Sequence, residues 1–159
     1  MKIIGIDPGT GIVGFGVIEY IHGKYKILDG GVIRTPAHQA DELRLRTIYD
    51  SLTEIMKQHT PDCMVVEKLF FAKNVTTAMS VSQARGVILL AGTQFNVPIA
   101  EYTPLQIKMA LTGYGRADKK QIQEMVRILL NLQSIPKPDD CADALAAALT
   151  HAHSVAMPR

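Results

Sequence analysis

The sequence has few of the features that mark the most easily recognised classes of protein. Its two cysteines, Cys63 and Cys141, lie beside apolar or small residues and form neither a CxxC motif nor a Cys/His spacing. We therefore expect neither a disulfide framework nor a zinc site. No internal repeat, linker or low-complexity tract interrupts the 159 residues. This length fits a single domain that covers residues 1–159.

Long apolar runs are missing as well. The first run, residues 3–6, is too short for the core of a signal peptide, and the longest, residues 86–92, is bounded by Arg85 and Gln94. A membrane span needs about 18 uncharged apolar residues in succession. We therefore expect a soluble protein of the reducing cytoplasm with no membrane partner.

A strong excess of one charge is also absent, since the formal net charge is only +2. On its own this charge predicts no nucleic-acid partner. Residues 108–137, however, contain six basic residues and only two acidic ones. A basic surface beside an acidic pocket would bring a polyanion to a metal site, although a solvated helix face also explains such a segment. The basic residues are Lys108, Arg116, Lys119, Lys120, Arg127 and Lys137.

The first part of the chain has the pattern of an antiparallel meander. Residues 2–7 are an apolar run, and residues 12–20 and 25–34 are rich in β-branched and aromatic side chains. The last two segments are separated by His22-Gly23-Lys24, which is typical of a hairpin turn. Three successive antiparallel strands are therefore predicted.

The apolar period then changes to that of helices alternating with short strands. Amphipathic spacing predicts a helix over 41–59, and a second helical segment is expected over 76–95. Each is followed by a short predicted strand, at 63–67 and 97–102. Further helices are expected to begin at Thr103 and Asp118, each with a glutamine three residues later, and at about Asp139. The last helix contains many small residues, which would let it lie close to a sheet. This order predicts an α/β fold with a mixed sheet and helices on its faces.

Two carboxylates follow predicted strands. Asp7 closes the first strand and Glu67 ends the apolar segment before it, and sheets of this kind tend to place their sites at the carboxyl ends of strands. Asp7 could instead only form a turn, and Glu67 could be exposed by chance at a strand tip. A buried glutamate, however, is costly unless it is paired or bound to a cation.

Two more carboxylates begin the last predicted helix. Asp140 and Asp143 are three residues apart and therefore project from one face. Acidic residues in a first turn also stabilise a helix, which explains Asp139 as a cap. Asp143 lies one turn further in, among alanine and leucine, and is harder to explain in this way. For Asp143 we favour a functional role.

The four carboxylates together offer only oxygen ligands. Such a set suits Mg²⁺ or Mn²⁺ rather than zinc. Two of these ions about 3.5–4 Å apart can clamp a phosphodiester, activate a water and stabilise the leaving oxygen. The predicted chemistry is hydrolysis without a protein nucleophile.

Ordered blocks along nearly the whole chain resemble the Holliday junction resolvases of the RuvC family. The first block alone is a weak signal, whereas the set in its order and spacing is highly specific. The blocks are GIDPG at residues 5–9, GFGV at 14–17, VE at 66–67, FFAKN at 70–74, SQARGV at 82–87, YTP at 102–104, QIK at 106–108, GYG at 113–115, ADK at 117–119 and DCADALA at 140–146.

The resemblance implies an RNase H-like fold with a five-stranded mixed sheet and helices on both faces. It implies a homodimer that cuts opposite strands of four-way junction DNA symmetrically, in bacterial recombination and repair. It also implies dependence on a divalent metal, two Mg²⁺ ions with Mn²⁺ as a substitute, and a branch-migration complex of RuvA and RuvB as partner.

The resemblance further assigns roles to individual residues. Asp7, Glu67, Asp140 and Asp143 match the catalytic, metal-binding carboxylates. Phe70 matches an aromatic residue that stacks near the junction crossover, although on its own the Phe70-Phe71 pair would more often be buried. Lys108 and Lys119 match basic residues that contact DNA or the scissile phosphate. Arg85 and Asn74 are further candidates for contact with DNA or for dimer stabilisation, with packing or helix capping as an alternative for Asn74.

Two positions depart from the family pattern. Val13 stands where threonine is frequent, and Lys68 stands where glutamine or glutamate is frequent.

Three other classes of protein share some of these features. YqgF-type nucleases share the glycine-rich opening and act on RNA, but the block from Glu67 to Asn74 fits the resolvases better. Nucleotide-binding proteins related to actin and the sugar kinases need two such domains. A junction-binding protein without cleavage would not need all four carboxylates.

Overall fold

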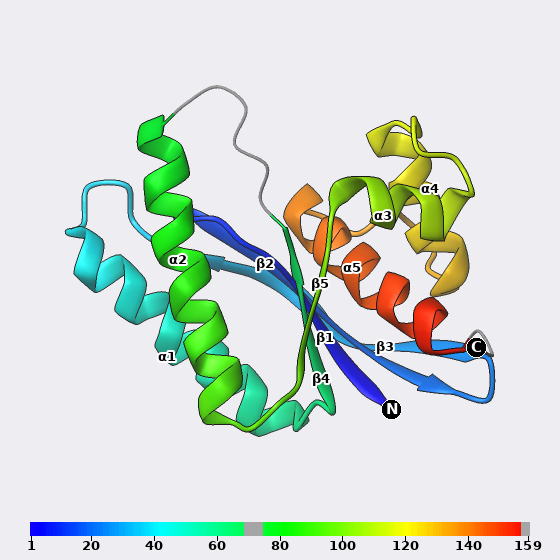
Figure 1. Cartoon of the computed structure of the whole chain (residues 1–159), viewed down its shortest axis with the longest axis horizontal. Helices are drawn as coiled ribbons and strands as arrows, with labels where there is room; N and C mark the ends of the chain where they lie inside the picture. Colours follow the sequence, from blue (N-terminus) through cyan, green and yellow to red (C-terminus); the bar gives the residue numbers. More distant parts are fainter. Residues whose placement is uncertain (69–74, 157–159) are drawn as a thin grey trace.

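The protein, a computed structural model that describes residues 1–68 and 75–156, is built around one mixed sheet (Figure 1). The strand order is β3-β2-β1-β4-β5, with β1 antiparallel to β2, β2 antiparallel to β3, and β1, β4 and β5 parallel to one another. This arrangement confirms the predicted meander and the mixed sheet. The strands are β1 (Lys2–Asp7), β2 (Ile12–Ile21), β3 (Lys24–Arg34), β4 (Cys63–Glu67) and β5 (Ile99–Tyr102).

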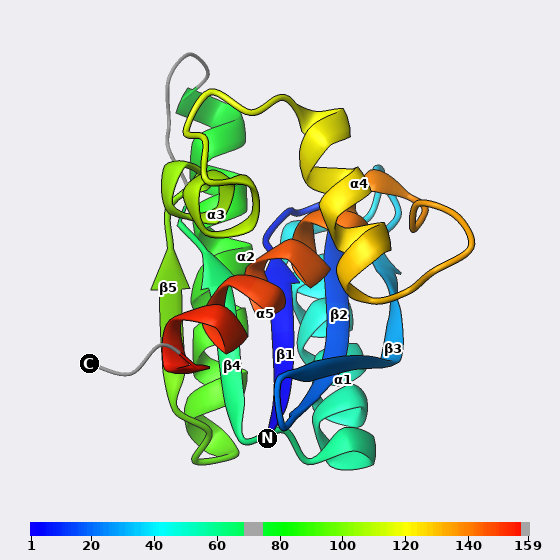
Figure 2. The same ribbon diagram turned by 90° about the vertical axis from the view of Figure 1, so that its right-hand side faces the viewer.

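Helices cover both faces of the sheet, as predicted. Figure 2 shows α3, α4 and α5 in front of the strands and α1 and α2 behind them. The helices are α1 (Asp41–His59), α2 (Val75–Gln94), α3 (Pro104–Thr112), α4 (Lys119–Leu129) and α5 (Asp139–Ala156). Within residues 1–68 and 75–156, no helix is both long and apolar enough to cross a membrane.

Strand alternation divides the buried side chains into two cores. Ile3 and Val65 point to the face that carries α3, α4 and α5, whereas Ile4, Ile6 and Val66 point to the face that carries α1 and α2. Successive side chains of a strand point to opposite faces, so a strand buried on both faces reads as a continuous apolar run. The short apolar runs at the start of the chain and before Glu67 have this explanation.

The alanine-rich helix α5 lies directly on the centre of the sheet. Two strand glycines make this close approach possible. A Cβ added at Gly5 would lie 2.0 Å from the backbone oxygen of Ala144, and one added at Gly14 would lie 2.0 Å from that of Asp140. The backbone of α5 therefore occupies the space that strand side chains would otherwise fill, which fixes the position of its first turn.

Several local predictions are confirmed, and two differ in detail. Thr103 with Gln106 and Asp118 with Gln121 form the expected capping boxes at α3 and α4. The last strand begins at Ile99, two residues later than predicted. Asp139 was expected to cap α5, but it is the first residue of the helix, and its carboxylate pairs with Lys119 of α4.

Candidate active site

The ends of β1 and β4 place two carboxylates next to each other. The two strands run parallel with Ile6 opposite Val66, so the next residues, Asp7 and Glu67, leave neighbouring strands at the same edge of the sheet. Both are half-buried. This is the edge at which open α/β sheets commonly form their sites.

The first turn of α5 adds the other two carboxylates. Asp7 is paired with Gly14 of β2, and the backbone of Asp140 lies directly against that glycine. Asp143 follows one turn later on the same face of the helix. All three partners, Glu67, Asp143 and Asp140, lie near enough to repel the charge of Asp7. The structure therefore brings together the four carboxylates that the sequence singled out.

Burial and mutual repulsion make these carboxylates hold protons more tightly than usual. Burial raises the pKa of Asp7, and repulsion by Glu67, Asp143 and Asp140 raises it further, to about 8. Burial, followed by repulsion from Asp143, raises the pKa of Glu67 to about 7. The pKa of Asp143 is also raised, chiefly by burial. A cluster of this kind is poised to exchange protons for a cation.

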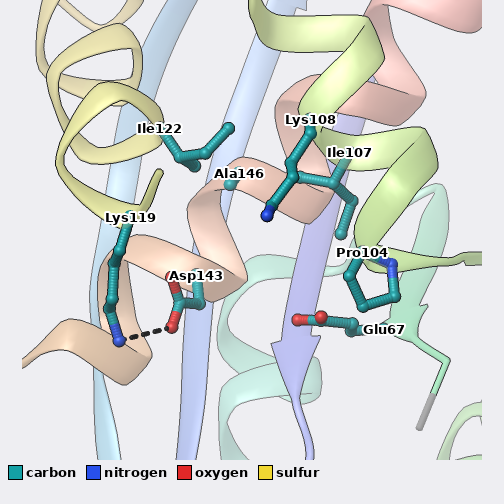
Figure 3. A pocket seen from close by; sticks show the side chains of 8 residues that line it. All are labelled: Glu67, Pro104, Ile107, Lys108, Lys119, Ile122, Asp143 and Ala146. Carbon is teal, nitrogen blue, oxygen red and sulfur yellow. Dashed lines mark ion pairs between the residues drawn. The ribbon is translucent and has the colours of Figure 1, made fainter. Parts of the chain in front are cut away.

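Lys119 supplies positive charge on the α4 side of the cluster. Its Nζ lies 3.1 Å from Oδ2 of Asp139. It also lies 3.2 Å from Oδ2 of Asp143 (Figure 3). Burial lowers the pKa of Lys119, but the hydrogen bonds to the two aspartates outweigh this effect and raise it overall. The ammonium therefore stays charged at the rim of the site.

A pocket joins the carboxylates to α3 and α4. Glu67 and Asp143 reach it from opposite sides, and Lys108 and Lys119 from the two helices (Figure 3). Anionic and cationic side chains thus line one opening, the combination that a phosphodiester near a metal would require. The full lining is Glu67, Pro104, Ile107, Lys108, Lys119, Ile122, Asp143 and Ala146.

The donor set fits a hard divalent cation, although its side chains are not closed around one. Within the part of the chain that the structure describes, no three His, Cys, Asp or Glu side chains converge closely enough to hold an ion. Asp143 pairs instead with Lys119, and the charges of Glu67, Asp143 and Asp140 repel that of Asp7. Four carboxylates in mutual electrostatic range are nevertheless the ligands that Mg²⁺ and Mn²⁺ prefer.

Hydroxyl groups hold the turn that follows Asp7. The Thr35 hydroxyl donates to the backbone oxygen of Thr10 (2.6 Å), and the Ser80 hydroxyl of α2 donates to the Thr10 hydroxyl (2.6 Å). Arg44 of α1 in turn donates to the Thr35 hydroxyl (3.0 Å). Three elements distant in sequence thus fix the turn. Nothing in the sequence pattern singled out Thr10, Thr35 or Ser80.

The remaining predicted residues fall in different places. Arg85 pairs with Glu101 of β5, so its charge is already balanced within the fold, and its contact with DNA stays a prediction. Phe70 and Asn74 lie outside the described residues. Of the two departures, Val13 is fully buried in the core, where a hydroxyl would need a partner, and Lys68 is exposed next to Glu67.

Asp139 and Glu101 take part in charge pairs that sequence reasoning missed. Asp139 was explained as a helix cap, yet it anchors Lys119. Glu101 lies in a short apolar strand without a motif, and only its neighbour across the fold, Arg85, shows its role. Both pairs join residues from different elements, so no local spacing could have predicted them.

Comparison with known proteins relates this arrangement to one family. Residues 3–151 match the family described as crossover junction endodeoxyribonuclease RuvC. The chain belongs to the RuvC family. A RuvC family protein from Desulforamulus reducens is 56% identical over 152 residues, covering 96% of this chain and 93% of that protein. One from Fusobacterium nucleatum is 54% identical over 155 residues, covering 98% and 82%.

Solved structures show the same relationship and confirm the RNase H-like fold. A structure described as Thermus thermophilus RuvC in complex with Holliday junction substrate has a TM-score of 0.94 at 36% identity, covering 98% of this chain and 94% of that one. The yeast mitochondrial Holliday junction resolvase Ydc2 has a TM-score of 0.67 at 14% identity, covering 95% and 77%. At that identity the second match supports the fold alone.

Proposed function

We propose that this RuvC family protein is a structure-specific DNA endonuclease that resolves four-way junctions by metal-dependent phosphodiester hydrolysis, in recombination and repair. One observation carries the proposal: Glu67, Asp140 and Asp143 all lie within electrostatic range of Asp7 at one edge of the sheet, beside a pocket that is lined by Lys108 and Lys119. The solved junction complex of a 36% identical relative supports the choice of substrate.

Asp7, Glu67, Asp140 and Asp143 are the residues that would hold Mg²⁺ or Mn²⁺. Bound divalent metal would supply an activated water and stabilise the leaving oxygen. The protein itself contributes position and charge. Lys119 bridges Asp139 and Asp143 at the rim, and Lys108 faces the pocket from α3. Their ammonium groups would attract the phosphates and orient the strand over the carboxylates.

The affinity of the site for a metal should rise with pH. A protonated carboxyl is a poor ligand, and the pKa values of Asp7 and Glu67 are about 8 and about 7. Below pH 7 a metal must displace both protons, and above pH 8 neither. We expect Mn²⁺ affinity, measured by calorimetry from pH 6 to pH 9, to increase by about tenfold per pH unit for each proton displaced, and then to level off.

Asp7→Asn is the control for that titration. It removes the group with the highest pKa, so the remaining pH dependence should be shallower and should level off earlier. A Mn²⁺ affinity that stays constant between pH 6 and pH 9 in the natural protein would contradict the assignment of these carboxylates as ligands.

The choice between substrates distinguishes the proposal from its two alternatives. A junction resolvase should nick a four-way junction and leave a linear duplex of the same sequence intact. A YqgF-like nuclease would cut RNA, and a binding protein would retain the junction without cutting it. Incubation of each substrate with and without Mg²⁺, followed by mapping of the cuts, separates the three.

We further propose that the protein acts as a homodimer formed through the outer face of α2. Met79 and Leu90 are exposed there by 63% and 52%, and Gln83 and Gly86 lie between them at helical spacing without a charge. The cationic Arg85 is already paired with Glu101. Exposed apolar side chains on an uncharged helix face are typical of interfaces between copies of a chain.

Sedimentation tests the dimer. At micromolar concentration the natural protein should have the mass of two chains, and Leu90→Glu should have the mass of one, because a buried unpaired carboxylate is costly. Val155→Glu is the matched control, since Val155 is also apolar and exposed (49%) but lies at the end of α5. A monomeric natural protein, with or without junction DNA, would contradict the dimer. So would a dimeric Leu90→Glu variant.

Other parts of the functional assignment rest on the sequence and on the family resemblance. These are one domain over residues 1–159, a cytoplasmic location, the RuvA and RuvB partners, stacking by Phe70 at the crossover, and contact of Asn74 and Arg85 with DNA. We propose them as properties of the same enzyme. They stay predictions.

A further inference from the structure

The loop between α3 and α4 holds an exposed aromatic ring on a fixed backbone. Tyr114 is 54% exposed. Its N–H donates to the Thr112 hydroxyl (3.1 Å), and its carbonyl accepts from the N–H of Ala117 (3.1 Å), a fully buried residue. The Thr112 hydroxyl in turn donates to the carbonyl of Lys108 in α3 (2.8 Å). The backbone is thus tied to α3 and to the buried Ala117 ahead of α4, while the ring remains exposed to solvent.

Two glycines on either side of Tyr114 explain how the loop reaches this position. Gly113 ends α3 in the left-handed region, with φ of 69°. A Cβ at Gly115 would lie 2.7 Å from Cδ1 of Leu105, so the loop lies directly on α3. Leu105 and Met109 are themselves exposed by 60% and 50%. The loop that holds Tyr114 therefore adjoins exposed apolar side chains of α3.

Cationic side chains precede and follow this loop along the chain. Lys108 and Lys119 line the pocket with the carboxylates, and Arg116 and Lys120 are exposed on the α4 side. In the described part of the chain, none of Lys108, Arg116 and Lys120 forms an ion pair with a carboxylate. The loop joins α3 and α4 at the end of the sheet where the carboxylates lie (Figure 2).

We propose that Tyr114 stacks on a nucleobase of the DNA arm next to the scissile phosphate, while the flanking cations hold the backbone of that arm. An aromatic face beside unpaired cations has the chemistry of a base-contacting surface, because bases stack on rings and phosphates bind ammonium and guanidinium groups. A fixed loop adds affinity, since little freedom is lost on binding. The inference rests on the proposed junction-cutting function.

Substitution in a non-cutting background tests the contact. With Asp7→Asn present throughout, Tyr114→Ala should bind a four-way junction about tenfold more weakly, and Tyr114→Phe should bind like the parent, because the ring is kept. Thermal unfolding should be nearly unchanged in both, since the ring is exposed. Equal junction affinity for Tyr114→Ala and its parent would overturn the proposal, and so would a loss that Tyr114→Phe shares.

A tryptophan reporter gives a readout that a structural role would not produce. The sequence contains no tryptophan, so Tyr114→Trp creates a single emitter. Its fluorescence should be quenched when junction DNA binds. Ile21→Trp is the control, because Ile21 is also exposed, by 48%. Ile21 follows Glu19, which pairs with Lys2 at the start of β1, so it lies at the opposite end of this strand from Asp7.

The outcomes separate this inference from the proposed function. Quenching at position 114 and not at position 21 supports the stacking. Tight junction binding with no quenching at either position overturns the stacking and leaves the nuclease proposal intact. If the natural protein neither binds nor cuts the junction, both proposals fail.

Discussion

Asp7→Asn is expected to lower the rate of junction cleavage by on the order of 10³-fold or more while leaving junction binding intact. Asp7 is flanked by Glu67 on the neighbouring strand, and Asp143 and Asp140 also repel its charge, so its carboxylate lies within electrostatic range of the other three. Asparagine keeps the shape of the side chain but loses the charge that a divalent cation requires. The measurement is single-turnover cleavage of a labelled junction in Mg²⁺, with junction affinity measured separately.

The same substitution should stabilise the metal-free protein at high pH. The pKa of folded Asp7, about 8, lies above its ordinary value of 3.8. The folded chain therefore binds a proton that the unfolded chain has released, and its free energy of unfolding falls as the pH rises from about 4 to about 8. The Asp7→Asn variant has no titratable group at this position, so its free energy of unfolding does not fall for this reason. Its melting temperature should exceed that of the natural protein at pH 8 and match it at pH 4.

Asp50→Asn is the matched control for both measurements. Asp50 is an exposed carboxylate of α1, with 58% of its side chain accessible, and it lies on the face of the sheet opposite α5. It should change neither cleavage nor the pH dependence of stability. An Asp7→Asn variant that cuts the junction at the natural rate would show that Asp7 is not part of the active site.

Gly14→Ala is expected to have the second largest effect, although the new methyl group carries no charge. It would lie 2.0 Å from the backbone oxygen of Asp140 and 2.4 Å from its carbonyl carbon. The first turn of α5 must then move away from the sheet. We expect a loss of about 2–4 kcal/mol in the free energy of unfolding. Because a displacement of about 1 Å can cost 10²-fold in rate, cleavage should fall at least that far.

Gly11→Ala is the control for this steric argument. A Cβ at Gly11 would first meet the guanidinium of Arg44 at 3.5 Å, an ordinary contact with the end of a flexible side chain. Its stability and cleavage rate should stay close to those of the natural protein. If Gly14→Ala and Gly11→Ala unfold at the same temperature and cut at the same rate, the close approach of α5 does not position the carboxylates.

Local sequence signals predicted most of the fold because their causes are local. Thr103 and Asp118 form capping boxes with glutamines three residues later, so each helix start is visible within four residues. The apolar run before Glu67 predicted a strand buried on both faces, and Met64 and Val65 are indeed fully buried on opposite sides. The small residues of α5 predicted its close contact with the sheet.

The parts that could not be predicted depend on contacts between distant segments. Nothing near Asp139 in sequence shows that Lys119 approaches it, and nothing near Arg85 identifies Glu101 as its partner. The four carboxylates were found singly as strand-end and helix-start acids. Their mutual electrostatic range follows only from the sheet register and from the contact of α5 with Gly14.

The most direct test of the proposed function is to map the cuts in a synthetic four-way junction and in a linear duplex of the same sequence, with Mg²⁺ added or withheld. A metal-dependent junction resolvase should make paired, symmetric nicks on opposite strands of the junction, only when metal is present, and should not cut the duplex. Equal cutting of junction and duplex, or tight binding of the junction without any metal-dependent nick, would contradict it.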